Sequence, residues 1–352
     1  MYIVGIGTAC PERRYTKADC WRAFLDSPWI EKLDRKARMI AERVLLRDNG
    51  IDARRLSVDS LQEVFAIDPT TLHARFLANA PALATCAARR ALADAGVVAA
   101  DIDSVIVSTC TGYLCPGLSS YVSEALRLRP DVQALDLVGQ GCGAALPNLR
   151  TADALLASGR CTRVLSICVE VCSAAMYLDN DPGVLISACL FGDGAGAAVL
   201  SAQPHHDKRR IRWKSAASLI GPADRDALRF EQREGLLRNV LTLAVPRLAA
   251  TYAQRVLETA LAAEGIRQSD IAGWIWHAGG RDVLAALRER IGLTIEDLRY
   301  SAEVLREYGN LSSAFVYFVL QQALTEKARG GRWWLASFGA GFSSHGALLE
   351  VA

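Results

Sequence analysis

Two stretches of the chain repeat the same order of apolar and polar positions. The segments ALADAGVVAADIDSVIVS (Ala91–Ser108) and ALAAEGIRQSDIAGWIWH (Ala260–His277) align without a gap. In each, an alanine-rich stretch with helical spacing ends at a glycine, and a polar loop leads through Asp-Ile into an apolar run. The pattern predicts a helix, a turn and a buried strand in both copies.

The repeat continues further along the chain. Cys142, in VGQGCGAALPNL, and Asn310, in EYGNLSSAFVYF, each open an apolar helical segment that ends in glycine before another buried strand. Alternating helices and strands predict an α/β fold of two similar halves, 1–205 and 206–352, joined within the polar segment AQPHHDKRRIR. Duplicated halves usually pack about a pseudo-twofold axis, which would bring Cys142, His277 and Asn310 together.

Composition excludes several classes of protein. The chain has 352 residues, 51% of them hydrophobic, and a net charge of +2 without a Lys/Arg run interleaved with aromatic residues, which predicts a large core and disfavours a nucleic-acid partner. Its first residues, MYIVGIGTACPE, lack a signal-peptide pattern, and Asp193 and glycines interrupt the longest nearly charge-free run. We therefore expect a cytoplasmic protein without a membrane span. Its ten cysteines show no zinc-ligand spacing, so we expect no metal site.

Cys142 is the candidate nucleophile. It lies between two glycines at a predicted strand-to-helix turn, where unusual backbone angles are tolerated and the sulfur can stand clear of its neighbours. The N–H groups at the start of a helix favour anions, so the pKa of this thiol is expected to fall. A small buried cysteine at a tight turn is the structural alternative.

His277 and Asn310 are the candidate partners of Cys142. His277 ends a predicted strand and precedes a loop of small residues, a common place for functional groups in α/β proteins. Considered alone, the histidine has a structural alternative, and Asn310 would be interpreted as a helix N-cap. The duplicated framework is what favours a shared site.

Cysteine, histidine and asparagine without a carboxylate fit two reactions. One is hydrolysis by a Cys/His pair that the asparagine orients. The other is a decarboxylative Claisen condensation, in which the thiolate holds an acyl group while His and Asn donate hydrogen bonds to a thioester oxygen that gains charge. The absence of an acid from the predicted set favours condensation.

Five ordered motifs resemble the type III polyketide synthases, the chalcone and stilbene synthase family. They are QGCGAALPNL, CLFGDGAGAAVL, WHAGG, YGNLSSAF and SFGAGF. The resemblance implies a thiolase-like, duplicated, five-layered αβαβα fold and a homodimer. It implies an acyltransferase that uses acyl-CoA and malonyl-CoA as substrates and needs no metal or redox cofactor.

The resemblance also assigns roles. Cys142 matches the nucleophile that carries the acyl group, and His277 and Asn310 match the pair that promotes decarboxylation and binds the thioester carbonyl. Phe191 matches the aromatic gatekeeper between the CoA tunnel and the cavity.

Other positions concern the cavity itself. Gly339 and Gly341 match the glycine loop that shapes the cyclisation pocket. Asn239 falls where the plant enzymes have a second gatekeeper phenylalanine, and Cys172 and Ala175 replace threonines that bound the cavity. Ala175 implies a larger cavity, and the stretch CVEVCSAAMYLDNDPGVLISACLFGDG most resembles the bacterial alkylresorcinol and alkylpyrone synthases. We expect a long-chain fatty acyl starter, malonyl extension and closure to an alkylpyrone or alkylresorcinol.

Several alternatives remain open at this stage. The basic residues of the N-terminal region either bind the CoA phosphates or form a solvated helix face: Arg38, Arg43, Arg54 and Arg55. The related ketoacyl-carrier-protein synthase that begins fatty acid synthesis shares the three candidate residue types. A hydrolase, or a catalytically silent acyl-CoA-binding protein on the same fold, is also compatible with the sequence.

Overall fold

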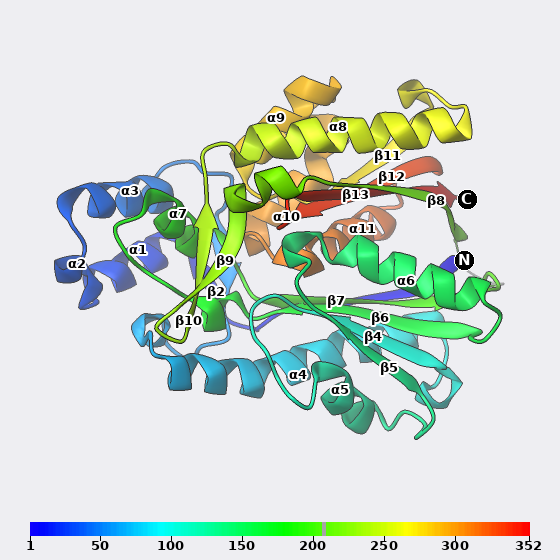
Figure 1. Ribbon diagram of the computed structural model, residues 1–352, viewed down its shortest axis with the longest axis horizontal. Helices are drawn as coiled ribbons and strands as arrows, with labels where there is room; N and C mark the ends of the chain where they lie inside the picture. The colour runs from blue at the N-terminus through cyan, green and yellow to red at the C-terminus, as the bar shows by residue number, and fades with distance from the viewer. Residues whose placement is uncertain (206–208) are drawn as a thin grey trace.

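A computed structural model describes residues 1–205 and 209–352 (Figure 1). The predicted boundary between the halves falls at the edge of this range, because residue 206 lies outside the described residues. The described chain contains a nine-stranded sheet in the order β11-β12-β13-β8-β1-β7-β6-β4-β5. Its strands are β1 (Tyr2–Ala9), β4 (Ser104–Ser108), β5 (Gln133–Leu137), β6 (Arg163–Glu170), β7 (Gly194–Ser201), β8 (Ile211–Ile220), β11 (Ile271–Trp276), β12 (Gly331–Gly339) and β13 (Ser343–Val351).

The sheet consists of two parts with the same order of pairing. From β1, the neighbours β7 and β6 pair antiparallel and β4 then pairs parallel. From β8, the neighbours β13 and β12 pair antiparallel and β11 then pairs parallel. Among the described residues, β1 and β8 join the two parts of the sheet, where Tyr2 and Ile3 pair with Arg212 and Ile211.

Helices cover and separate the two parts, as Figure 1 shows. Helices α4 and α5 pack on the β1–β7 part, and α8 packs on β8 and β13 with α9 beside it. Helices α6 and α11 lie between the two parts and contact strands of both. The result is five layers, αβαβα. These helices are α4 (Pro69–Ala95), α5 (Leu118–Leu126), α6 (Ala145–Ala157), α8 (Val245–Glu264), α9 (Arg281–Ile291), α10 (Arg299–Tyr308) and α11 (Phe315–Thr325).

The two repeated segments form the same local structure. Helix α4 ends at Gly96 with φ 65° and helix α8 ends at Gly265 with φ 64°, a left-handed cap that glycine adopts without strain. One turn of 3-10 helix follows in each copy, and then a buried strand, β4 or β11. The predicted helix, turn and strand are therefore present in both copies.

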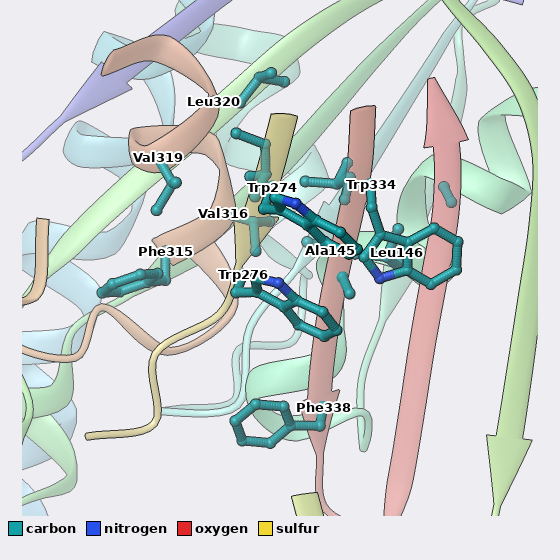
Figure 2. Packing of buried hydrophobic residues seen from close by; sticks show 14 of the residues in the cluster. Ala145, Leu146, Trp274, Trp276, Phe315, Val316, Val319, Leu320, Trp334 and Phe338 are labelled. Carbon is teal, nitrogen blue, oxygen red and sulfur yellow. The ribbon is translucent and has the colours of Figure 1, made fainter. Parts of the chain in front are cut away.

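The core is formed where the central helices meet the second part of the sheet. Val316 of α11 lies near Trp276, and Phe315, Trp334 and Ala145, which starts α6, belong to the same buried cluster (Figure 2). Since α6 follows Cys142 and α11 follows Asn310, this packing holds the two candidate residues on one rigid layer.

Shorter elements outside the repeats gather at one end of the molecule (Figure 1). They include the hairpin of β9 and β10, and α7, which packs against α3 and β10. Their bounds are β2 (Arg14–Thr16), α1 (Lys17–Leu25), α2 (Trp29–Lys32), α3 (Arg35–Leu46), β3 (Ala53–Arg55), α7 (Pro182–Leu190), β9 (Leu228–Arg233) and β10 (Leu236–Leu241). Several of them line the cavities described below.

Candidate active site

Cys142 lies in a single 3-10 turn, Gly141–Gly143, immediately before α6. Gly141 has φ 55°, a conformation that disfavours a side chain. A Cβ atom added to Gly339, at the end of β12, would lie 2.4 Å from the backbone nitrogen of Gly143. The glycines therefore allow the end of β12 to touch the turn that carries the cysteine.

The hydrogen-bond partner of the Cys142 thiol is Ser312. The Ser312 hydroxyl lies 3.2 Å from Sγ of Cys142, and its backbone N–H donates to Oδ1 of Asn310 at 2.9 Å. Within residues 1–205 and 209–352, no hydrogen bond joins the thiol directly to His277. Ser312 is thus the link between the nucleophile and the second half of the chain.

The expected fall in the pKa of Cys142 was wrong. Burial raises the pKa of this thiol to about 12, which outweighs the lowering effect of the Ser312 hydrogen bond, and the nearby Glu170 carboxylate raises it further. The short turn before α6 does not offset the loss of solvation. In this structure the thiol is protonated at neutral pH.

A buried carboxylate lies beside the cysteine, contrary to the expectation of a site without an acid. Glu170, at the end of β6, is fully buried, and its Oε1 lies 3.2 Å from the Ser312 hydroxyl. It also accepts hydrogen bonds from Ser313, from the Thr111 hydroxyl at 2.9 Å and from the Cys110 N–H at 3.0 Å. Burial raises the pKa of Glu170, and these donors oppose the rise.

His277 and Asn310 form a buried pair. Nε2 of His277 lies 3.1 Å from Oδ1 of Asn310, while Nδ2 of Asn310 donates to the Gly279 carbonyl at 3.3 Å. The Ser312 N–H donates to the amide atom of Asn310 that faces the ring, which identifies this atom as the oxygen. An amide oxygen can only accept hydrogen bonds, so Nε2 of His277 carries the proton.

The environment keeps this imidazole neutral. Burial lowers the pKa of His277 to about 4, and the Asn310 hydrogen bond opposes the fall. The rings of Phe315 and Phe338 lie 5.5 and 4.7 Å from the imidazole, centre to centre. The Nδ1 atom is buried and has no hydrogen-bond partner in the described part of the chain. The imidazole is therefore neutral, and its one N–H, on Nε2, donates to Oδ1 of Asn310.

The predicted cavity residues surround the cysteine. A chamber of about 40 Å³ is lined by Cys142 and by the predicted Phe191, Cys172, Ala175 and Asn239. A wider, open chamber of about 690 Å³ adjoins it and is lined by Gly341, whereas Gly339 packs beneath the Cys142 turn.

Phe230 was not among the residues predicted from the sequence to line this site. Phe230 on β9 pairs directly with Asn239 on β10, and both line the smaller chamber. Residues paired across an antiparallel hairpin project from the same face, so the aromatic ring missing at position 239 is provided by the opposite strand. Only the pairing of β9 with β10 would have revealed this.

The four arginines do not form one surface. Arg54 is buried, and Arg55 bonds the Glu12 carbonyl and the Glu307 carboxylate, so neither is a free phosphate ligand. Arg38 and Arg43 lie on α3, where Arg43 is exposed and Arg38 half-buried.

Two features are absent from the described residues. No His, Cys, Asp or Glu side chains gather there in threes or more so as to hold a metal ion. No helix there is both long and apolar enough to cross a membrane.

Two family profiles match nearly the whole chain. One, described as FAE1/type III polyketide synthase-like protein, matches residues 30–219. The other, described as chalcone and stilbene synthases, C-terminal domain, matches residues 213–350. The chain belongs to the type III polyketide synthase family. The resemblance drawn from the five motifs is confirmed, and this polyketide synthase is a decarboxylative condensing acyltransferase that uses acyl-CoA and malonyl-CoA.

Individual relatives agree with this assignment. The synthase is 29% identical over 360 residues to the 3,5-dihydroxyphenylacetyl-CoA synthase of Streptomyces toyocaensis, covering 99% of this chain and 89% of the relative. Among solved structures, PKS-I of the brown alga Ectocarpus siliculosus superposes with a TM-score of 0.90 at 24% identity, covering 99% of this chain and 98% of that one. The type III polyketide synthase domain of Steely1 from Dictyostelium gives a TM-score of 0.86 at 24% identity, with 99% of both chains covered. These structures confirm the thiolase-like fold.

Proposed function

We propose that Cys142 accepts the acyl starter and that His277 and Asn310 drive decarboxylation of malonyl-CoA. The observation that carries this proposal is the link through Ser312, which contacts the Cys142 thiol and Oδ1 of Asn310, itself bonded to His277. The first half, 1–205, would then supply the nucleophile, and the second, 206–352, the donor pair.

Loading begins with the attack of Sγ of Cys142 on the carbonyl carbon of the acyl-CoA. The new C–S bond replaces the bond to CoA, which leaves as a thiol, so one proton must pass from Cys142 to CoA. Ser312 is placed to accept the thiol proton while passing its own to the Glu170 carboxylate, 3.2 Å away, and the same two groups acting in reverse would return a proton to the sulfur of the departing CoA. This relay would serve a thiol whose pKa burial has raised to about 12.

Extension then uses the neutral donor pair. Loss of CO2 from malonyl-CoA leaves an enolate. N–H groups of His277 and Asn310 would stabilise its oxygen without a net charge in the site, once that oxygen replaces Oδ1 of Asn310 as the acceptor of the Nε2 proton. The enolate carbon attacks the Cys142 thioester, a C–C bond forms, and the sulfur leaves as a thiolate. We expect no metal or redox cofactor for these steps.

We propose that the starter is a long-chain fatty acyl group and that the product is an alkylpyrone or alkylresorcinol. The enzyme is proposed to act as a homodimer. Ala175 and Cys172 line the smaller chamber, and the adjoining open chamber, of about 690 Å³, has room for an alkyl chain. Phe191, at the exit of α7, would act as the gate between CoA and the chamber.

A short starter is the second candidate, because the chamber around Cys142 measures only about 40 Å³ and Phe230 occupies one wall. The Streptomyces relative carries the name of an aryl acyl-CoA product, which suits a compact chamber. The two candidates differ in the chain length that loads on Cys142.

The test is intact-protein mass after mixing the enzyme with acyl-CoAs from acetyl to palmitoyl, with Cys142→Ala in parallel. If the wild type alone gains an acyl mass, and long chains load best, the long-chain starter is supported. If only short acyl groups load on the wild type, the short starter is supported. Addition of malonyl-CoA and mass analysis of the products then distinguishes pyrone from resorcinol. Loading of both proteins, or of neither from CoA and carrier-bound donors alike, contradicts the proposal.

A further inference from the structure

Arg54 is a buried cation without a carboxylate in ion-pair contact. Only 6% of its surface is exposed, and no ion pair joins it to a carboxylate among residues 1–205 and 209–352. An arginine is rarely buried without compensation, because its desolvation is costly. The groups that compensate it therefore indicate why it is there.

The guanidinium bonds to backbone carbonyls at the end of α7. Nη1 of Arg54 donates to the carbonyl of Ala188 at 2.9 Å and to that of Phe191 at 3.3 Å. The last carbonyls of a helix have no intrahelical partner and carry partial negative charge, so a cation is favoured there. Arg54 thus fixes the point at which the chain leaves α7, where Phe191 enters the chamber wall.

The segment that leaves α7 also forms hydrogen bonds with the backbone of Asn310. Its N–H donates to the Leu190 carbonyl at 2.9 Å, and its carbonyl accepts the Gly192 N–H at 3.0 Å, an isolated bridge between Phe191 and Asn310. On the other side, the side-chain stem of Arg54 lies against Gly309, where an added Cβ would come 3.0 Å from Cγ of Arg54. Arg54 therefore contacts both segments that this bridge joins.

We infer that Arg54 is a positioning residue that holds Asn310 and Phe191 in register through the end of α7. It acts through the backbone of both residues and touches neither side chain of the donor pair. The inference rests on the roles proposed above for Asn310 and Phe191. It also explains why this basic residue is unavailable to the phosphates of CoA.

The test compares two steps on the same protein. Arg54→Met keeps the apolar stem and removes the donors, and Arg54→Lys keeps a charged donor at the same place. We would measure CO2 release from malonyl-CoA and acylation of Cys142 by an acyl-CoA, and take their ratio. A lower fraction of folded protein reduces both rates equally and leaves the ratio unchanged, and the folded fraction measured by circular dichroism converts each rate into a rate per folded enzyme. Arg288→Met, an exposed arginine on α9, is the matched control.

We expect Arg54→Met to lower the ratio by about 10- to 100-fold, since a displacement of about 1 Å is enough for such a loss. Arg54→Lys should recover part of it. If Arg54→Met does not fold, a lowered ratio in Arg54→Lys relative to Arg288→Met carries the inference. Unchanged rates of both steps per folded enzyme, in whichever Arg54 variants fold, overturn it. If the wild type itself neither acylates nor releases CO2, the proposed function fails and not this inference alone.

Discussion

Asn310 fixes the proton of His277 on Nε2, because its Oδ1 lies 3.1 Å from that nitrogen and already accepts the Ser312 N–H. The consequence is a neutral ring with one defined donor, held by burial at a pKa of about 4. A donor of this kind stabilises a developing enolate without requiring an imidazolium in the site.

Asn310→Asp should therefore remove the stabilisation that His277 and Asn310 give to the enolate. The carboxylate would raise the pKa of His277 from about 4 and oppose the negative charge of the enolate. We expect CO2 release from malonyl-CoA to fall by about 10²–10³-fold, the usual loss for an oxyanion donor. The measurement is CO2 release between pH 5 and pH 8, where the wild type should show no His277 titration. Asn310→Ala removes the donor without adding charge, and an Asn310→Asp enzyme no worse than the alanine variant would contradict the electrostatic argument.

The raised pKa of Cys142 predicts how its reactivity depends on pH. Below its pKa a thiol gains a factor of ten in thiolate for each pH unit, so alkylation of Cys142 should rise steadily beyond pH 10. Free glutathione in the same mixture should level off near its own lower pKa. The measurement is the rate of iodoacetamide labelling of the Cys142 peptide by mass spectrometry. A plateau below about pH 9 would mean that the thiolate is stabilised by an interaction absent from this structure.

Ser312 lowers the pKa of Cys142 through its hydrogen bond, so Ser312→Ala should raise that pKa further. Labelling at pH 8 should then slow by about 3- to 10-fold, the effect of losing one hydrogen bond of about 1 kcal/mol. Ser313→Ala is the matched control, since that hydroxyl bonds Glu170 and does not contact Sγ. Equal labelling of the two variants would show that the Ser312 contact does not act on the thiol.

Much of the fold could be predicted because it follows from local patterns of apolar residues and glycines. The repeat of helix, glycine and buried strand predicted two equivalent halves, and the structure shows the left-handed caps at Gly96 and Gly265 and the matching strands β4 and β11. The repeat also predicted that Cys142, His277 and Asn310 would converge. They do so, although the Cys142 contact runs through Ser312.

The features of the site that could not be predicted depend on burial and on pairing between distant segments. Glu170 lies in the apolar string VLSICVEV, and nothing local shows that its side chain turns toward Cys142 rather than solvent. The pKa of the thiol follows from desolvation by the whole fold, which outweighed the local effect of the helix start. Arg54 could equally have been a surface cation, and only its burial against the end of α7 distinguishes the two.

Gly339 should tolerate no side chain, because its added Cβ would lie 2.4 Å from the Gly143 nitrogen and 2.6 Å from the Gln140 carbonyl. Gly339→Ala must displace the Cys142 turn, and we expect the free energy of unfolding to fall by about 1–3 kcal/mol, as for other overpacked sites. Chemical denaturation measures this change. Gly280→Ala is the control, since its nearest neighbour would be 3.7 Å away. Similar losses in the two variants would show that the contact with the Cys142 turn is not what requires glycine.

Phe230 and Asn239 face the chamber together from opposite strands of one hairpin, so the size of each should set which starter fits. Phe230→Ala removes a ring from the wall beside Cys142, and we expect loading to shift toward longer acyl chains by about tenfold relative to the wild type. Asn239→Phe fills the same space and should shift loading toward shorter chains. The measurement is competition among acyl-CoAs of different length for Cys142, read by intact mass. Val240→Ala is the matched control, because this neighbour of Asn239 projects from the opposite face of β10. If Phe230→Ala and Val240→Ala keep the same order of preference as the wild type, the starter does not contact this wall, and the open chamber alone determines its length.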